Sequence, residues 1–176
     1  MAQRGADIIV DHLVENNVPY AVGVCGHGNI QLLDALRLKS ERIKTLTTHH
    51  ESAAGFMADA YFRVSHQPLV TFSSTGPGSF NMPIAMANAM ADSSAFLAIT
   101  SDVPTEQFNR GAFQEVGWHN QQDFQMVTRP FVKRVFQPMT PESIPLTVRQ
   151  AYQTMMRGRF GLVNLMVPFD LFARET

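Results

Sequence analysis

Three short segments combine glycine or histidine with residues that can bind a ligand or transfer a proton. Gly26-His27-Gly28 follows a β-branched run at residues 20–24, His49-His50-Glu51 follows an expected strand at 43–47, and Ser74-Thr75-Gly76-Pro77-Gly78 follows another at 69–72. A carboxylate at Glu51 can reach a cofactor at the edge of a sheet while its neighbours stay packed. A glutamate in the first turn of a helix is also favoured by the helix dipole alone, so its position by itself leaves a structural role open.

The glycine-containing segment at residues 23–29 lies between an expected strand and an expected helix. Such a loop can hold a phosphate on its backbone N–H groups, or it can be a tight strand-to-helix turn. It does not match G-x-G-x-x-G, and the sequence contains no G-x-x-x-x-G-K-[ST] segment. The tight turn is therefore the simpler interpretation of these residues taken alone.

His49-His50-Glu51 does not extend into a metal-binding motif. H-E-x-x-H requires a histidine at position 54, which is Ala54. The two adjacent histidines cannot share one helix face, so we expect no metal held by this chain alone. Cys25 beside His27 suggests a nucleophile and base, but a single cysteine at a strand end is more often a small buried hydrophobic residue. The sequence also lacks the G-x-S-x-G motif of serine hydrolases.

Helix-like and strand-like segments alternate along the whole chain. The periodicity and the turn residues predict helices at 4–17, 30–38, 51–64, 80–90, 120–127 and 141–157, and strands at 20–24, 43–47, 69–72, 96–100, 131–136 and 162–167. Residues 101–119 are expected to form a long irregular loop, and long loops in compact domains are often functional. Pro83 is compatible only with the first turn of its helix.

This alternation predicts an α/β fold, with a parallel six-stranded sheet covered by helices on both faces. The length of 176 residues suits a single domain over residues 1–176. Ligands of such sheets bind beyond the carboxyl ends of the strands. The segments that contain His27, Glu51 and Pro77, and the loop after Thr100, all lie at those ends, so the sequence predicts a site there.

Composition narrows the function. A hydrophobic content of 45%, a charged content of 16% and a net charge of −1 are ordinary for a water-soluble protein, and no basic run suggests nucleic acid as a partner. No apolar stretch is long enough to span a bilayer, and the first residues lack the apolar core of a signal peptide. Cys25 is the single cysteine, which fits a reducing, cytoplasmic location.

Two expected helices carry unusually small side chains, at Ala53, Ala54, Gly55, Ala58 and Ala60 in one and at Ala85, Ala87, Ala89 and Ala91 in the other. Small residues let another backbone come close, which would suit a helix-to-helix contact between subunits. Three methionines recur at intervals of four in the second segment, and core packing is their simplest role. The low charge and the ten methionines also agree with a surface that is buried against a partner.

Four ordered segments carry a family resemblance: GHGN at 26–29, HHESAAGFMADAYFR at 49–63, STGPGSFNMPIAMANAMADSSAFLAITSDVP at 74–104 and GAFQE at 111–115. Together they resemble the N-terminal pyrimidine-binding domain of thiamine-diphosphate-dependent enzymes, and are most similar to the acetolactate synthase and related 2-oxo acid decarboxylase group. GLVNLMVPFDLF at 161–172 is similar to the closing strand of that domain. Each motif alone is weak, whereas the ordered set is specific.

The resemblance implies a role for Glu51, which matches the family's conserved glutamate. It implies that this carboxylate hydrogen-bonds ring nitrogen N1′ of the cofactor aminopyrimidine and favours the imino tautomer. The imino nitrogen then takes the proton from thiazolium C2, and the cofactor serves as electron sink for decarboxylation of a 2-oxo acid or for carboligation.

The same resemblance implies roles for further residues. Gly26 and His27 match the loop that faces the reacting carbon, where His27 would donate a proton or contact the substrate. Pro77 and Asn81 match positions near the pyrimidine, and Gln114 matches a glutamine that approaches the active site. His50 precedes the key glutamate as in the synthase group, which makes it a further candidate for substrate contact.

One departure from the family pattern shapes the expected partner. The family holds Mg²⁺ and the diphosphate with a Gly-Asp-Gly segment and a downstream Asn, and this sequence has no Gly-Asp-Gly. We therefore expect the pyrimidine-domain subunit of a split enzyme, paired with a separate diphosphate-binding subunit in an α2β2-type heteromer. The alternatives are a non-catalytic regulatory or binding module that retains the fold, and an unrelated flavodoxin-like or nucleotide-binding domain, which the missing phosphate motifs disfavour.

Overall fold

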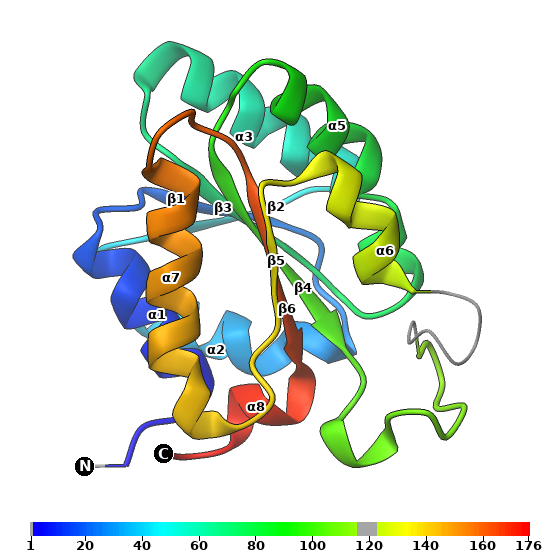
Figure 1. Ribbon diagram of the computed structural model, residues 1–176. Helices are drawn as coiled ribbons and strands as arrows, with labels where there is room; N and C mark the ends of the chain where they lie inside the picture. Colours follow the sequence, from blue (N-terminus) through cyan, green and yellow to red (C-terminus); the bar gives the residue numbers. More distant parts are fainter. Residues whose placement is uncertain (1, 116–122) are drawn as a thin grey trace.

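A computed structural model describes residues 2–115 and 123–176 (Figure 1). These residues form a six-stranded, fully parallel sheet in the order β2-β1-β3-β4-β6-β5. The strands are β1 (Tyr20–Gly23), β2 (Lys44–Thr47), β3 (Leu69–Ser73), β4 (Phe96–Asp102), β5 (Val135–Phe136) and β6 (Val163–Pro168). The predicted fold class is confirmed.

Helices cover both faces of the sheet, as Figure 1 shows. One face packs on α1 (Gly5–Glu15), α2 (Ile30–Leu38), α7 (Ile144–Met156) and α8 (Phe169–Ala173). The other packs on α3 (Glu51–Ser65) and α5 (Pro83–Ala91), with α6 (Phe124–Thr128) beside α5. Successive strand residues contribute to opposite cores because side chains alternate across a sheet: Leu97 and Ile99 face the first group of helices, and Phe96 and Ala98 face the second.

The expected helix at 80–90 is divided in two. A four-residue helix, α4 (Pro77–Phe80), precedes α5, and Pro83 occupies the first turn of α5. Proline lacks an amide hydrogen and is tolerated only where that hydrogen would have no helical partner. The break turns the chain at Asn81 and Met82, and this turn places Asn81 beside α3.

Other boundaries also differ from expectation. The strand predicted at 131–136 is reduced to β5, and its expected first residue belongs to a 3-10 turn at Arg129–Phe131. The helix expected at 141–157 begins with a 3-10 turn over Pro141–Ser143 before α7. The helix expected at 120–127 is present as α6, although residues 120–122 lie outside the described part. The sequence reading did not predict α8.

The small faces of α3 and α5 pack against each other within the chain. A Cβ added to Gly55 would lie 2.5 Å from the Ala85 Cβ, which shows how closely the two backbones approach. Farther along, the Asn88 amide donates to the buried Asp59 carboxylate at 2.7 Å, and Arg63 bonds the same carboxylate. At Gly55 and Ala85 the small side chains thus serve a contact within the chain, and the subunit contact suggested for these helices stays a prediction.

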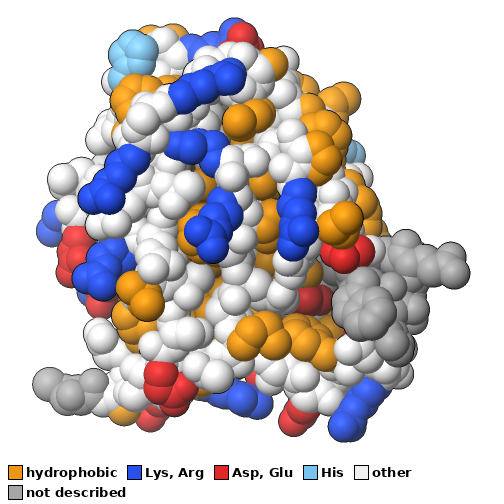
Figure 2. Space-filling model, in the orientation of Figure 1, with side chains coloured by type: hydrophobic (Ala, Val, Ile, Leu, Met, Phe, Trp, Pro, Cys, Tyr) orange, Lys and Arg blue, Asp and Glu red, His pale blue; other side chains and the backbone are white. Residues whose placement is uncertain are grey.

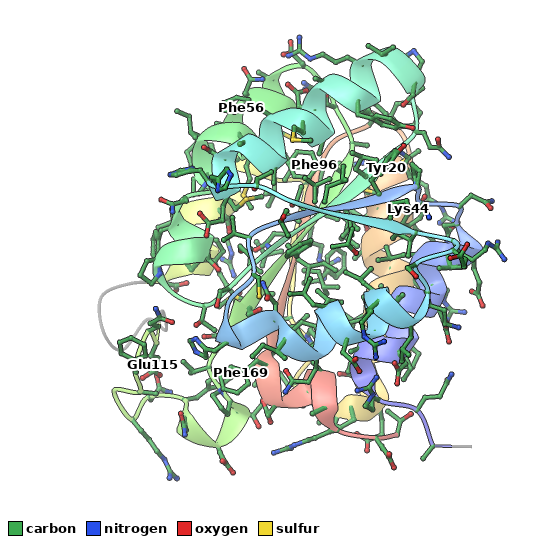
Figure 3. All side chains as sticks on the ribbon, turned by 180° about the vertical axis from the view of Figure 1, so that it is seen from behind. Tyr20, Lys44, Phe56, Phe96, Glu115 and Phe169 are labelled. Atoms are coloured by element: carbon green, nitrogen blue, oxygen red, sulfur yellow. The ribbon has the colours of Figure 1, made fainter. Side chains whose placement is uncertain are left out.

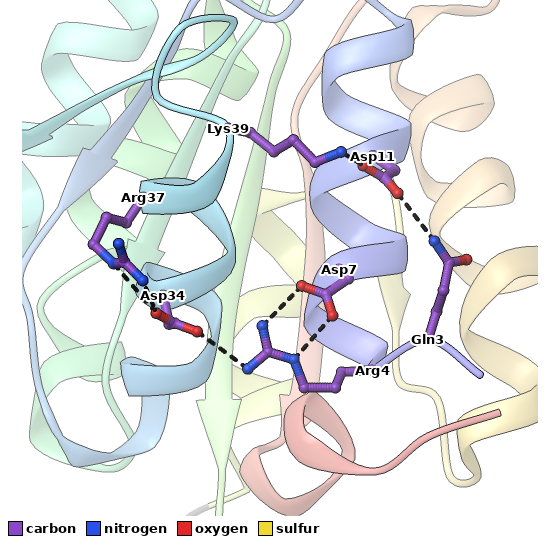
Figure 4. A network of polar contacts seen from close by, with 7 residues as sticks. All are labelled: Gln3, Arg4, Asp7, Asp11, Asp34, Arg37 and Lys39. Carbon is purple, nitrogen blue, oxygen red and sulfur yellow. Dashed lines mark hydrogen bonds and ion pairs between the residues drawn. The ribbon is translucent and has the colours of Figure 1, made fainter. Parts of the chain in front are cut away.

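Ion pairs tie α1 to α2 at the side of the sheet away from α3 (Figure 4). Arg4 binds Asp7 in its own helix turn and Asp34 in α2, and Lys39 reaches Asp11. These side chains are partly exposed, so solvent screens each pair and its contribution to stability is small. The network links the two helices, and its charged groups are paired with one another.

The outer surface mixes charge signs. Figure 2 shows Lys and Arg side chains interspersed with acidic and hydrophobic ones on one face, in keeping with the net charge of −1. None of the helices in the described residues is both long enough and apolar enough to cross a membrane.

Candidate functional site

The candidate site lies where the strand order reverses. The chain passes from β1 outward to β2 and then returns to β3 on the other side of β1. The loops after β1 and β3 therefore leave neighbouring strands in opposite directions, which is where open parallel sheets bind ligands. A hydrogen bond from the Gly28 amide to Ser74 Oγ, at 3.2 Å, joins the two loops.

Glu51 begins α3, four residues after the end of β2. Its side chain is only 7% exposed, and its Oε2 accepts a hydrogen bond of 2.8 Å from the Asn81 amide. Its Oε1 lies beside Gly78, where an added Cβ would be 3.0 Å away. Within the described residues Asn81 is the one hydrogen-bond partner of this carboxylate, so it keeps unused acceptor capacity.

The segment that follows β3 lies against the Glu51 carboxylate. Gly76 adopts a φ of 59°, which favours glycine, and Pro77 starts α4 directly after it. This sharp turn brings Gly78 against Glu51, where a larger residue would crowd the carboxylate. Pro77 and Asn81, both expected near the pyrimidine, thus belong to the one turn that faces Glu51.

His27 contacts the same segment at Thr75. Its Nε2 is 3.3 Å from Thr75 Oγ1, and Thr75 Oγ1 donates to Gln114 Oε1 at 3.0 Å. The imidazole ring meets Phe169 edge to face, with 5.6 Å between ring centroids, and Phe113 lies 6.4 Å away. Residues from three distant parts of the sequence thereby form one polar cluster between two aromatic rings, and we call His27, Thr75 and Gln114 the histidine cluster.

Gln114 is held in an uncommon backbone conformation. Its φ is 64°, which non-glycine residues rarely adopt. The adjacent Glu115 carboxylate is buried and accepts the backbone N–H groups of Asn109, Gly111 and Ala112. This carboxylate closes the loop on itself and fixes the position from which Gln114 reaches Thr75.

Gly26 positions His27 through backbone approach. A Cβ on Gly26 would lie 2.4 Å from Ser74 Cβ, so no other residue fits without displacing the β3 loop. The buried Asn29 side chain accepts from the Gly26 amide at 3.0 Å and donates to the Val24 carbonyl at 3.0 Å. These bonds satisfy the polar backbone of the turn, so the glycine loop is the tight turn that the sequence favours.

His50 and Cys25 differ from the other candidates. His50 is exposed and serves as the N-cap of α3, where its Nδ1 accepts the Ser52 amide at 3.3 Å. This contact gives His50 a structural role at the helix start. Cys25 is exposed, so the expectation of a buried cysteine is wrong: its position just past the end of β1 directs it away from both cores.

Asp102, the last residue of β4, is a buried carboxyl group. Burial, and to a lesser degree the charge of Glu115, raises the pKa of Asp102 from 3.8 to about 6. The Val103 amide and the Gln137 side chain donate to it and oppose this rise. Figure 3 labels Glu115 and Phe169, which lie at this same end of the sheet.

Sequence reasoning missed the residues that support the site: Thr75, Asp102, Glu115 and Phe169. All four lie inside the segments that carry the family resemblance, at 74–104, 111–115 and 161–172, and that was the available signal. Across residues 2–115 and 123–176, no group of three or more His, Cys, Asp or Glu side chains is arranged to hold a metal ion.

Comparison with known proteins decides the family. The family model described as thiamine pyrophosphate enzyme, N-terminal TPP binding domain, matches residues 3–124. The chain belongs to the thiamine pyrophosphate enzyme family. The match spans β1 to β4 and every residue of the two groups around Glu51 and His27 except Phe169, which follows it.

Curated relatives within the family are acetolactate synthases. A probable acetolactate synthase large subunit of Methanocaldococcus jannaschii is 36% identical over 168 residues, which cover 96% of this chain and 27% of the relative. The acetolactate synthase isozyme 1 large subunit of Escherichia coli is 30% identical over 95% of this chain and 28% of the relative. An Arabidopsis thaliana chloroplastic acetolactate synthase is 31% identical, over 96% and 24%. The chain thus spans about a quarter of the length of these proteins.

Proposed function

We propose that this chain supplies the pyrimidine-binding half of a thiamine-diphosphate-dependent decarboxylase or carboligase that acts on a 2-oxo acid, with Glu51 as the residue that activates the cofactor. The observation that carries the proposal is the buried Glu51 carboxylate, with one partner among the described residues and a glycine where a larger side chain would crowd it. Membership of the family and similarity to acetolactate synthases support the same reaction class.

The residues around Glu51 fit an aminopyrimidine. A protonated ring nitrogen needs a negatively charged acceptor in a water-poor setting, and the 7% exposed Glu51 provides one. Asn81 holds Oε2 at 2.8 Å, so the carboxylate is oriented before any ligand arrives. When bound, thiamine diphosphate supplies the electron sink for cleavage of the bond to the carboxyl group.

In this proposal, residues of this chain bind and orient the cofactor and the substrate. Glu51 would accept a hydrogen bond from the ring nitrogen and so maintain the tautomer, while the turn at Gly76 and Pro77 keeps Gly78 against the carboxylate. His27 and Gln114 both contact Thr75 and are the groups that we assign to substrate contact and proton donation. His50 is exposed directly before Glu51 at the start of α3, and we assign it as a further substrate contact.

The proposal also includes a second polypeptide, which completes the cofactor site. The 176 residues contain no Gly-Asp-Gly segment, so the groups for Mg²⁺ and the diphosphate come from outside them. We assign those groups to a separate subunit in an α2β2-type heteromer, and we place the complex in the cytoplasm. The competing function, a non-catalytic module, does not require the ordered groups around both Glu51 and His27.

The decisive test follows exchange of the C2 proton of thiamine diphosphate with deuterium, because this readout does not depend on the unknown substrate. In the complex with its diphosphate-binding subunit and Mg²⁺, Glu51→Gln should slow exchange by about 10² to 10⁴-fold, as for loss of an acid–base group. Glu41→Gln, an exposed glutamate before β2, is the matched control and should leave exchange unchanged.

Either of two results would refute the proposal. An unchanged exchange rate in Glu51→Gln would remove Glu51 from cofactor activation and favour the non-catalytic module. Tight binding of thiamine diphosphate by the purified chain alone, with turnover of a 2-oxo acid, would show that no second subunit is needed.

A further inference from the structure

Thr75 joins two polar side chains that come from opposite ends of the family-matched region. It is 1% exposed, and its Oγ1 contacts His27 Nε2 at 3.3 Å and Gln114 Oε1 at 3.0 Å. His27 and Gln114 have no direct hydrogen bond to each other among the described residues. Thr75 is therefore the residue that links the hydrogen bonding of His27 to that of Gln114.

The single hydrogen of the Thr75 hydroxyl group determines which tautomer of His27 fits this contact. A threonine hydroxyl has one hydrogen to donate, and here it donates to the Gln114 carbonyl oxygen. The contact with His27 must then use a lone pair of Oγ1, so the hydrogen between them belongs to His27 Nε2. In the neutral ring, Nδ1 consequently carries the lone pair.

We propose that Thr75 is a positioning residue that holds neutral His27 as the Nε2–H tautomer and orients the Gln114 amide, so that the two side chains act as a pair. The pair offers a ligand one acceptor, His27 Nδ1, and one donor, the Gln114 amide nitrogen. It is suited to a substrate with a hydroxyl or protonated group next to a carbonyl or carboxylate oxygen. This specificity rests on the proposed function, whereas the tautomer does not.

Packing keeps the hydroxyl in place. A β-branched side chain has few χ1 options, and the Thr75 methyl lies against Gly28, where an added Cβ would be 2.8 Å from Cγ2. Phe169 meets the His27 ring edge to face at 5.6 Å between centroids and restricts its rotation. At the other end, a Cβ on Gly76 would lie 2.8 Å from Gln114 Cβ, so glycine there is required for Gln114 to approach.

The test measures the tautomer directly. The full chain labelled with ¹⁵N-histidine is studied by NMR at alkaline pH, where imidazole is neutral, and the His27 signals are assigned by their loss in His27→Gln. The wild-type chain should carry the proton on Nε2. Thr75→Val keeps the branched shape but removes the hydroxyl, and should change the tautomer ratio by about fivefold, the bias that one net hydrogen bond provides. Thr75→Ser should keep the wild-type ratio.

Each contrary result overturns the proposal. A wild-type proton on Nδ1 does so without any variant, which keeps the test decisive even if Thr75→Val fails to fold. An unchanged ratio in Thr75→Val would show that the hydroxyl does not control the ring, and a Val-like ratio in Thr75→Ser would assign the effect to packing. The NMR sample contains neither cofactor nor partner subunit, so these outcomes are independent of the deuterium-exchange test of Glu51.

Discussion

Gly55→Ala probes the close contact between α3 and α5 on which the position of Glu51 depends. At an ordinary helix position this substitution stabilises a protein by about 1 kcal/mol, because alanine favours the helix more than glycine does. Here the new Cβ would lie 2.5 Å from the Ala85 Cβ. The structure therefore predicts the opposite sign.

The size of the effect follows from the overlap. Two carbon atoms in favourable contact are about 3.5 to 4.0 Å apart, so the helices must separate by about 1 Å or more. Ala85 Cβ is attached directly to the backbone and cannot swing away. Overpacking of this kind costs about 1 to 3 kcal/mol, and after the gain in helix propensity the expected net loss is about 1 kcal/mol.

Urea denaturation of the purified chain measures the free energy of unfolding. Ala60→Gly is the matched control, since Ala60 is exposed in the same helix and reports propensity alone, with an expected loss of about 1 kcal/mol. The double variant Gly55→Ala with Ala85→Gly removes the overlap. The cycle should show a favourable coupling of about 2 kcal/mol between the two positions.

Increased stability of Gly55→Ala, similar in size to the loss in Ala60→Gly, would refute the reasoning. So would a coupling near zero, because it would mean that α3 and α5 do not meet at these residues. In the complex, the displaced helix should also slow cofactor activation, since Glu51 stands at the start of α3.

Two further predictions concern stability away from Glu51. Lys133→Met should lower the free energy of unfolding by about 1 to 2 kcal/mol, because Lys133 Nζ donates to the carbonyls of Thr154, Arg157 and Arg159 at the end of α7. The control Lys44→Met, on the exposed strand β2, should have little effect. Equal losses for the two variants in urea denaturation would contradict this prediction. Asp102 has a folded-state pKa of about 6 against 3.8 ordinarily, so the unfolded chain loses this proton first and stability falls as pH rises between about 4 and 6, by about 3 kcal/mol. Asp102→Asn should lack this component in denaturation measured across that range, and an identical pH dependence of both proteins would count against the assignment.

Local patterns were sufficient for the secondary structure of most of the chain. The strands β1 to β4 and the helix α3 lie within one or two residues of the expected ranges, because period and turn chemistry are local properties. There are exceptions: Pro83 divides the expected helix at 80–90, the strand expected at 131–136 is reduced to β5, and α8 was not predicted. At Pro83 the missing amide hydrogen outweighs the hydrophobic pattern.

The sequence by itself determined that Glu51 stands at a helix start, that glycine loops follow the strands, and that the ordered motifs belong to one family. It did not determine which of these residues are in contact in the folded chain. Glu51 binds Asn81, thirty residues away, and Thr75 links His27 to Gln114, because β3 inserts beside β1 and returns the chain to the same edge. Strand order is a global property set by the packing of two cores, so only the tertiary structure decides these partners.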